Sequence, residues 1–190
     1  QLSQRTTMET LKIALLAKSS FSSYSKEMIT PILEDNSMKI NACAIYSPKE
    51  KTLKQKLKSS WDKGRRSAIL VIIIEMIIKK LKGKISSKPT ISFSTKDFFK
   101  KHSVEILETK RLYSPETLNF LKNSGAQVLI LFEYHGIVKN EILELFPQGV
   151  LSYHYGNMRK YRGQPAAFWE LYHNETEMGV TVQRIDLGID

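Results

Sequence analysis

The last forty residues hold the side chains of this chain that are best suited to chemistry. His154 follows a short apolar run that begins at Val150, and a histidine at the end of a strand is well placed to exchange protons near neutral pH. Cationic and aromatic side chains gather in the stretch 157–163, and two carboxylates, Asp186 and Asp190, close the sequence. This combination predicts a shared site in which the histidine takes part in the chemistry.

A metal centre is the alternative use of these residue types. His135, His154 and Asp190 could supply ligands to zinc, but they lack the short-range spacing that supports a zinc site. The single cysteine, Cys43, lies in an apolar run and is expected to be a buried thiol in a reducing compartment. One cysteine makes neither a disulfide framework nor a cysteine-based zinc site, so we expect no metal.

Apolar runs alternate with helical patterns along the chain. Nearly continuous apolar runs are typical of parallel strands that are covered on both faces. Their alternation with helices predicts an α/β fold with a mostly parallel, Rossmann-like sheet flanked by helices, and the first strand at its centre. Strands are expected at 11–17, 38–46, 104–108, 128–132, from residue 150, and at 179–185.

Helix signals fill the intervals between these strands. Ser114 and Pro115 form a typical helix start, with serine as N-cap and proline in the first turn. The stretch 18–23 reads as a polar loop, and because it lacks the glycine spacing of a dinucleotide site, it argues against that function. Helices are expected at 24–33, 94–101, 115–123, 142–146 and 165–172.

The stretch 49–88 is a basic and hydrophobic helical insertion in a domain that spans 11–190. Within it, 65–81 is apolar almost all round, which predicts burial against the sheet or self-association. Its longest apolar run is too short to cross a bilayer. Residues 1–10 lack the apolar core of a signal peptide and are expected to be a disordered leader or a cloning remnant.

The formal net charge of +10 has two interpretations. Half of the lysines lie in 49–63 and 79–88, outside any known nucleic-acid-binding motif, which favours solvated helix faces over a nucleic-acid site. The charge also gives a weak attraction for anionic ligands such as a folate, a nucleotide-sugar or tRNA.

The final stretch resembles the folate-dependent formyltransferases, the family that includes glycinamide ribonucleotide transformylase, methionyl-tRNA formyltransferase and the sugar-nucleotide N-formyltransferases. That family has a strand ending in Asn-x-His, a loop ending in Tyr-Arg-Gly, and a Gly-Val-Thr strand leading to an aspartate in a turn. The matching positions here are 152–154, 160–163, 179–182 and 186–190, with Ser152 in place of the asparagine and Tyr155-Gly156 in place of the usual Pro-Ser.

The resemblance implies a role for each site residue. His154 falls on the catalytic histidine, Asp190 on the catalytic aspartate, and Ser152 on the asparagine that helps to bind the oxyanion; spacing favours Asp190 over Asp186. From the residues alone, His135 could instead cap its loop, and Tyr161 and Arg162 could tie their loop to the next helix. The pterin of the donor would contact Phe132, Glu133, Tyr134, His135, Gly136, Ile137 and Val138, and the acceptor would contact Ser19, Asn157, Arg159, Tyr161, Arg162 and Gly163.

The resemblance further implies a cytoplasmic N-formyltransferase that moves a formyl group from 10-formyltetrahydrofolate to an amine. The acceptor would be an anionic small molecule, a nucleotide-linked sugar or an aminoacyl-tRNA, and family members continue past the turn at Asp190. Imidazolium at His154 would stabilise the oxyanion and supply a proton, and the Asp190 carboxylate would favour the charged ring. Because serine is shorter than asparagine, two alternatives stay open: a catalytically silent binding module, and a hydrolase of the formyl donor.

Overall fold

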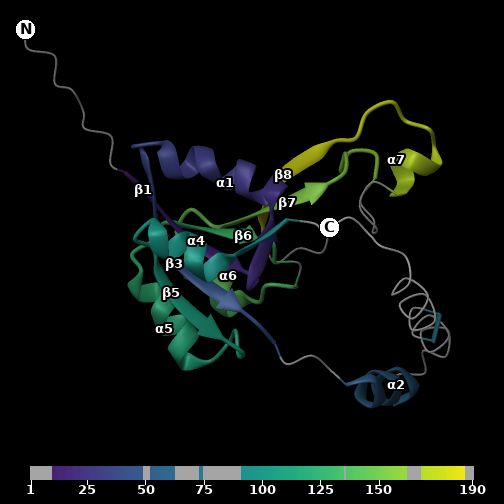
Figure 1. Ribbon diagram of the computed structural model, residues 1–190, viewed down its shortest axis with the longest axis horizontal. Coiled ribbons are helices and arrows are strands. Elements are labelled where there is room, and N and C mark those ends of the chain that lie inside the picture. The colour runs from purple at the N-terminus through teal and green to yellow at the C-terminus, as the bar shows by residue number, and fades with distance from the viewer. Residues whose placement is uncertain are drawn as a thin grey trace, which may run out of the picture. The chain divides into compact units, whose positions relative to one another are not determined.

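The computed structural model describes the chain as two compact units (Figure 1). The smaller unit, 48–91, contains helix α2 (Leu53–Asp62). The apolar helix expected at 65–81, for which burial or self-association was predicted, lies outside the described residues except for 73–74. The larger unit combines 1–47 with 92–190 and carries the sheet. The described residues are 10–48, 52–62, 73–74, 91–134, 136–161 and 168–186.

A six-stranded sheet forms the centre of the larger unit. Its strand order is β5-β3-β1-β6-β7-β8, and every neighbouring pair is parallel except β7 and β8. The mostly parallel α/β fold and the inner position of the first strand are therefore confirmed. The strands are β1 (Leu11–Ala17), β3 (Met38–Tyr46), β5 (Glu105–Thr109), β6 (Val128–Phe132), β7 (Val150–Tyr155) and β8 (Val180–Ile185).

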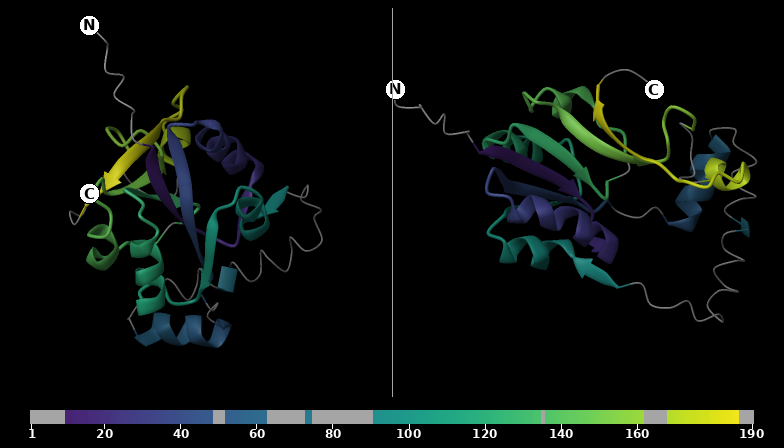
Figure 2. Two further views of the ribbon diagram at one scale, coloured as in Figure 1. Left: turned by 90° about the vertical axis from the view of Figure 1, so that its left-hand side faces the viewer. Right: turned by 90° about the horizontal axis from the view of Figure 1, so that it is seen from above.

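Helices cover both faces of this sheet, as Figure 2 shows. Leu15 of β1 belongs to one buried cluster and Leu16 to the other, because successive side chains of a strand point to opposite faces. The first cluster includes residues of α1 (Ser23–Glu34) and α4 (Thr95–Lys101). The second includes residues of α5 (Pro115–Asn123) and α6 (Asn140–Leu143).

The helix starts follow the serine signals of the sequence. The side chain of Ser114 accepts a hydrogen bond from the Thr117 backbone N–H, and Pro115 occupies the first turn of α5, as predicted. Ser94 caps α4 in the same way. Helix α6 begins two residues before the predicted start and ends at Leu143. Of the helix predicted at 165–172, the described part is α7 (Phe168–Tyr172).

The stretch expected to be a polar loop at 18–23 contains a short strand, so that prediction was wrong. Strand β2 (Ser20–Ser22) pairs in antiparallel fashion with β4 (Ser92–Ser94). The reason is Phe21, which is buried and stacks on Phe93 with ring centroids 5.7 Å apart. The burial of Phe21 therefore gives this serine-rich segment an apolar anchor.

Strands β7 and β8 form a ribbon that extends beyond the parallel sheet. β7 pairs with β6 only at Val150 and Leu151, whereas it pairs with β8 from Val150 to Tyr155. In Figure 1 the two strands run together towards α7. Residues 152–155 are therefore paired on the β8 side alone among the described strands.

Cys43 is expected to be unreactive in the folded chain. It is buried in β3 and burial raises the pKa of its thiol, so the reactive thiolate is scarce near neutral pH. A disulfide reagent such as Ellman's reagent should label the thiol only after unfolding in guanidinium. Stoichiometric labelling of the native protein within minutes would contradict this burial.

Candidate functional site

The carboxyl ends of β1, β6 and β7 meet at one edge of the sheet because these strands run parallel. In such sheets, ligands bind at this edge. Ser19, predicted to contact the acceptor, lies here with an exposed side chain, and its carbonyl accepts a hydrogen bond of 3.0 Å from the Thr95 backbone N–H. Among the described helices, none is long and apolar enough to span a membrane.

Ser152 and His154 lie on the same face of β7. They share this face with Val150, because every second side chain of a strand points the same way, and Val150 packs in the cluster that includes residues of α5 and α6. On β8 their directly paired residues are Gln183 and Thr181, respectively. Paired residues of an antiparallel ladder share a face, so these four side chains lie on one surface.

His154 lies close to a buried carboxylate that the sequence analysis did not select. A side-chain carbon built on Gly156 would be 3.1 Å from Nε2 of His154 and 3.3 Å from Oε1 of Glu170. Glu170 is only 5% exposed, and Oε1 accepts a hydrogen bond of 3.2 Å from the Asn157 backbone N–H. Because Gly156 has no side chain, the imidazole and the carboxylate approach each other across it. The sequence feature that could have pointed to Glu170 is that it is the one charged residue in the apolar run 168–172.

Of the two candidate aspartates, Asp186 is the one among the described residues, and it lies away from His154. Asp186 follows β8, whose last residue Ile185 pairs with Val150 at the beginning of β7. Four residues of strand therefore separate this end of the ribbon from His154, or about 13 Å. Asp190 lies outside the described residues, as do His135, Arg162 and Gly163. In the described part of the chain, no three histidine, cysteine or acidic side chains are grouped as metal ligands.

The loop after β6, predicted to hold the pterin, is fixed by two tyrosines. The Tyr153 hydroxyl accepts a hydrogen bond of 3.3 Å from the Glu133 backbone N–H. The Tyr113 hydroxyl donates to the Ile137 carbonyl at 3.3 Å and accepts from the Lys139 N–H at 2.9 Å. The backbone of Ile137 is thus held in place, while its side chain is 89% exposed.

The remaining residues of this loop face in different directions. Phe132 packs in the core against Phe21 and Phe99, which leaves only its backbone for a ligand. Val138 is buried. Tyr134 lies against Tyr46, with ring centroids 6.0 Å apart, and burial raises the pKa of its hydroxyl to about 12. Gly136 lies beside the Tyr134 ring.

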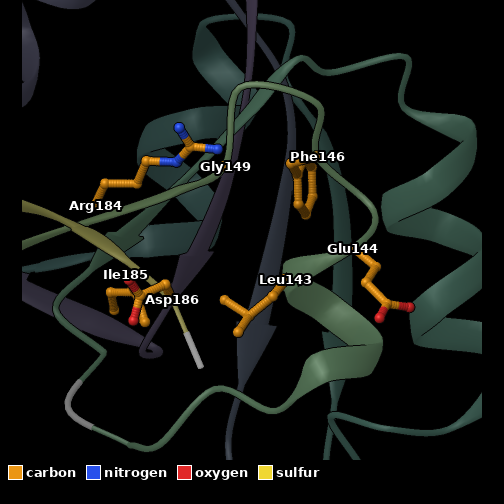
Figure 3. Close-up of a pocket in the computed structure, with 7 residues that line it drawn as sticks. All are labelled: Leu143, Glu144, Phe146, Gly149, Arg184, Ile185 and Asp186. Carbon is orange, nitrogen blue, oxygen red and sulfur yellow. The ribbon is translucent and has the colours of Figure 1, made fainter. Parts of the chain in front are cut away.

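A cavity of about 640 Å³ opens at the other end of the same β7 face (Figure 3). Its walls come from α6 and the turn after it, from the residue before β7, and from the end of β8, so it combines apolar side chains with one cation and two carboxylates. This volume is in the range of ligand pockets. The lining residues are Leu143, Glu144, Phe146, Gly149, Arg184, Ile185 and Asp186.

A second cavity, of about 390 Å³, contains Asn157, Tyr161 and Glu170. The Tyr161 hydroxyl donates to Oε1 of Glu175 at 2.8 Å, and Lys160 pairs with the same carboxylate at 3.2 Å. These contacts lower the pKa of Glu175 and keep it ionised, and the hydrogen bond from Tyr161 has the largest effect. The Arg159 side chain is exposed, and its backbone N–H donates to Asn157 Oδ1 at 3.1 Å.

Comparison with known proteins gives concordant results. Among curated proteins, the methionyl-tRNA formyltransferases of Solibacter usitatus and Trichodesmium erythraeum are 34% and 36% identical over 88 and 90 residues. The matched stretches cover 46% and 47% of this chain, but only 28% and 27% of those relatives.

Solved structures share the architecture. Glycinamide ribonucleotide transformylase 1 from Geobacillus kaustophilus aligns with a TM-score of 0.56 at 14% identity, over 96% of this chain and 78% of that protein. The corresponding enzyme from Symbiobacterium toebii gives a TM-score of 0.55 at 14% identity, over 95% and 68%. At this identity the likeness concerns the fold. A sequence model of the formyl transferase family matches residues 12–190, and the chain therefore belongs to the formyl transferase family.

Proposed function

We propose that this chain carries an N-formyltransferase site that moves a formyl group from 10-formyltetrahydrofolate to a primary amine. The observation that carries the proposal is the shared face of β7, which joins the 640 Å³ cavity at one end to His154 at the other. Membership of the formyl transferase family supports the same reaction class.

The larger cavity suits the pterin end of the donor better than the loop 132–138, where the resemblance implied it, because Phe132 and Val138 are buried in the core. A pterin is flat and carries several hydrogen-bonding groups, and the cavity combines Leu143, Phe146 and Ile185 with the carboxylates of Glu144 and Asp186. In Figure 3 the Ile185 side chain comes from β8 on one side of the cavity, and those of Leu143 and Phe146 come from α6 and the turn after it on the other. A donor seated here extends along the β7 face, which brings its formyl group past Ser152 to His154.

His154 then performs the proton transfer. The amine nitrogen attacks the formyl carbon, the oxyanion develops, and the bond to the donor nitrogen breaks as a proton passes from the attacking to the leaving nitrogen. An imidazolium beside the reacting carbon stabilises the oxyanion and supplies that proton. Glu170, on the other side of Gly156, brings a carboxyl oxygen close to the imidazole. We propose Asp190 as a second carboxyl partner of the His154 ring.

The smaller cavity suits the acceptor amine. Glu170 borders it with a buried carboxylate, whereas Glu175 is already paired with Lys160 and Tyr161. The net charge of +10 favours an anionic molecule as the carrier of that amine. Because the curated relatives named above are methionyl-tRNA formyltransferases, we favour an aminoacyl-tRNA as the acceptor class.

Donor binding tests this proposal directly. The probe is 10-formylfolate, the oxidised and stable form of the donor, titrated into the full-length protein by calorimetry. Leu143→Arg, which fills the larger cavity, should weaken binding at least tenfold. Leu171→Arg is the matched control, because Leu171 is 76% exposed, and should leave affinity unchanged. Circular dichroism verifies that both variants are folded.

The outcomes separate the candidate functions. No binding of 10-formylfolate at millimolar concentration ends the donor assignment. Binding with formate release but no formylated amine identifies a hydrolase, and binding with neither product identifies a silent module.

A further inference from the structure

Gln183 has a buried side-chain oxygen for which the described residues supply no partner. Oε1 is inaccessible to solvent and accepts no hydrogen bond within the part of the chain that the structure describes. Its neighbours on β8 point the other way, since Val182 is 71% exposed and Arg184 is exposed too. A buried polar group without a partner destabilises the fold, and a ligand that supplies the partner would remove this cost.

The strand register places this amide beside the reacting centre. Gln183 is directly opposite Ser152, and His154 is its diagonal neighbour because His154 pairs with Thr181. Directly opposite residues have Cβ atoms about 5 Å apart, and diagonal ones lie within reach of long side chains. A glutamine, one carbon longer than asparagine, can therefore bring its amide group from β8 into the space in front of Ser152.

We propose that Gln183 supplies the carboxamide of the formyl-transfer site, in place of an asparagine at position 152. This inference rests on the proposed function. The amide nitrogen donates to the formyl oxygen as it becomes an oxyanion, and the buried Oε1 accepts an N–H of the attacking amine. Both hydrogen bonds strengthen during attack, because negative charge grows on the oxygen and positive charge on the nitrogen.

The reaction balances with groups already named. The lone pair of the amine forms the new carbon–nitrogen bond, and the carbonyl electron pair moves to oxygen. Collapse of this intermediate restores the carbonyl and breaks the bond to the donor nitrogen. The proton lost by the amine reaches that nitrogen through His154, while Gln183 remains uncharged and unchanged.

Isotope-edited infrared spectroscopy tests the donor half of this role without an acceptor. The probe is 10-formylfolate with a ¹³C-labelled formyl carbon, bound to the full-length protein. A hydrogen bond from Gln183 lowers the formyl carbonyl stretching frequency below that of the free probe. Gln183→Leu should return the frequency towards the free value, and adding Ser152→Asn in the same chain should lower it again.

The control is Gln148→Leu, which removes an exposed amide elsewhere and should leave the bound frequency unchanged. In turnover, Gln183→Leu should lower kcat on the order of a hundredfold, as for loss of an oxyanion donor, with donor affinity within severalfold. An unchanged frequency in Gln183→Leu overturns the assignment of Gln183 alone. A wild-type chain that does not bind the probe overturns the proposed function and this inference together.

Discussion

His154→Asn is expected to abolish formyl transfer while the affinity for 10-formylfolate stays within severalfold. Asparagine keeps a hydrogen-bond donor of similar size but has no ionisable ring, so the proton cannot pass between the two nitrogens. Donor affinity is preserved because the proposed pterin cavity is about 13 Å away along β7. Turnover with an aminoacyl-tRNA, calorimetry with 10-formylfolate and melting temperature should be measured on the same variant.

His102→Asn is the matched control, since His102 is exposed at the end of α4, and it should retain wild-type turnover. If His154 were only structural, the variant would melt at a lower temperature, and activity would fall only in proportion to the unfolded fraction. Near wild-type turnover of His154→Asn would end the proposed mechanism.

Phe99→Ala is expected to give the largest loss of stability, about 3–5 kcal/mol in the free energy of unfolding. Phe99 is fully buried, and its ring lies 5.2 Å from Phe98, 5.8 Å from Phe132 and 6.2 Å from Phe21 between centroids. Alanine would leave a cavity among these rings, because a packed aromatic cluster relaxes only in part.

Urea denaturation followed by circular dichroism measures this loss. Phe168→Ala is the control, because Phe168 is 45% exposed and its removal leaves no enclosed cavity. A loss below 1 kcal/mol for Phe99→Ala would show that the cluster collapses around the missing ring.

The sequence predicts the central strands well for a physical reason. β1 and β6 are covered by helices on both faces, so nearly every residue is apolar and the run itself marks the strand. The predicted bounds of 11–17 and 128–132 agree with Leu11–Ala17 and Val128–Phe132. The half-exposed β8 is also found, although its start moves from residue 179 to Val180.

Contacts that depend on which strands pair, and in which register, could not be predicted from the pattern of apolar residues. β2 (Ser20–Ser22) and β4 (Ser92–Ser94) have three residues each, too few to show a pattern, and they lie far apart in the chain. The position of Gln183 opposite Ser152 depends on the register of β7 and β8, which composition does not define. Glu170 was missed because it follows His154 at a distance in the sequence, and the two side chains come close only where the fold brings both to Gly156.

The ribbon of β7 and β8 has a consequence for the energetics of binding. Beyond Leu151, side chains of β7 contact the rest of the unit: the Tyr153 hydroxyl accepts from the Glu133 N–H, and the Tyr155 ring lies beside Tyr24 of α1. Opening the ribbon beyond Leu151 breaks side-chain contacts but none of the described ladder pairs with β6, so we expect local opening to cost less than global unfolding. A donor that reaches from α6 to His154 would contact both the ribbon and the helix layer beside it. Part of its binding free energy would then oppose local opening of the ribbon.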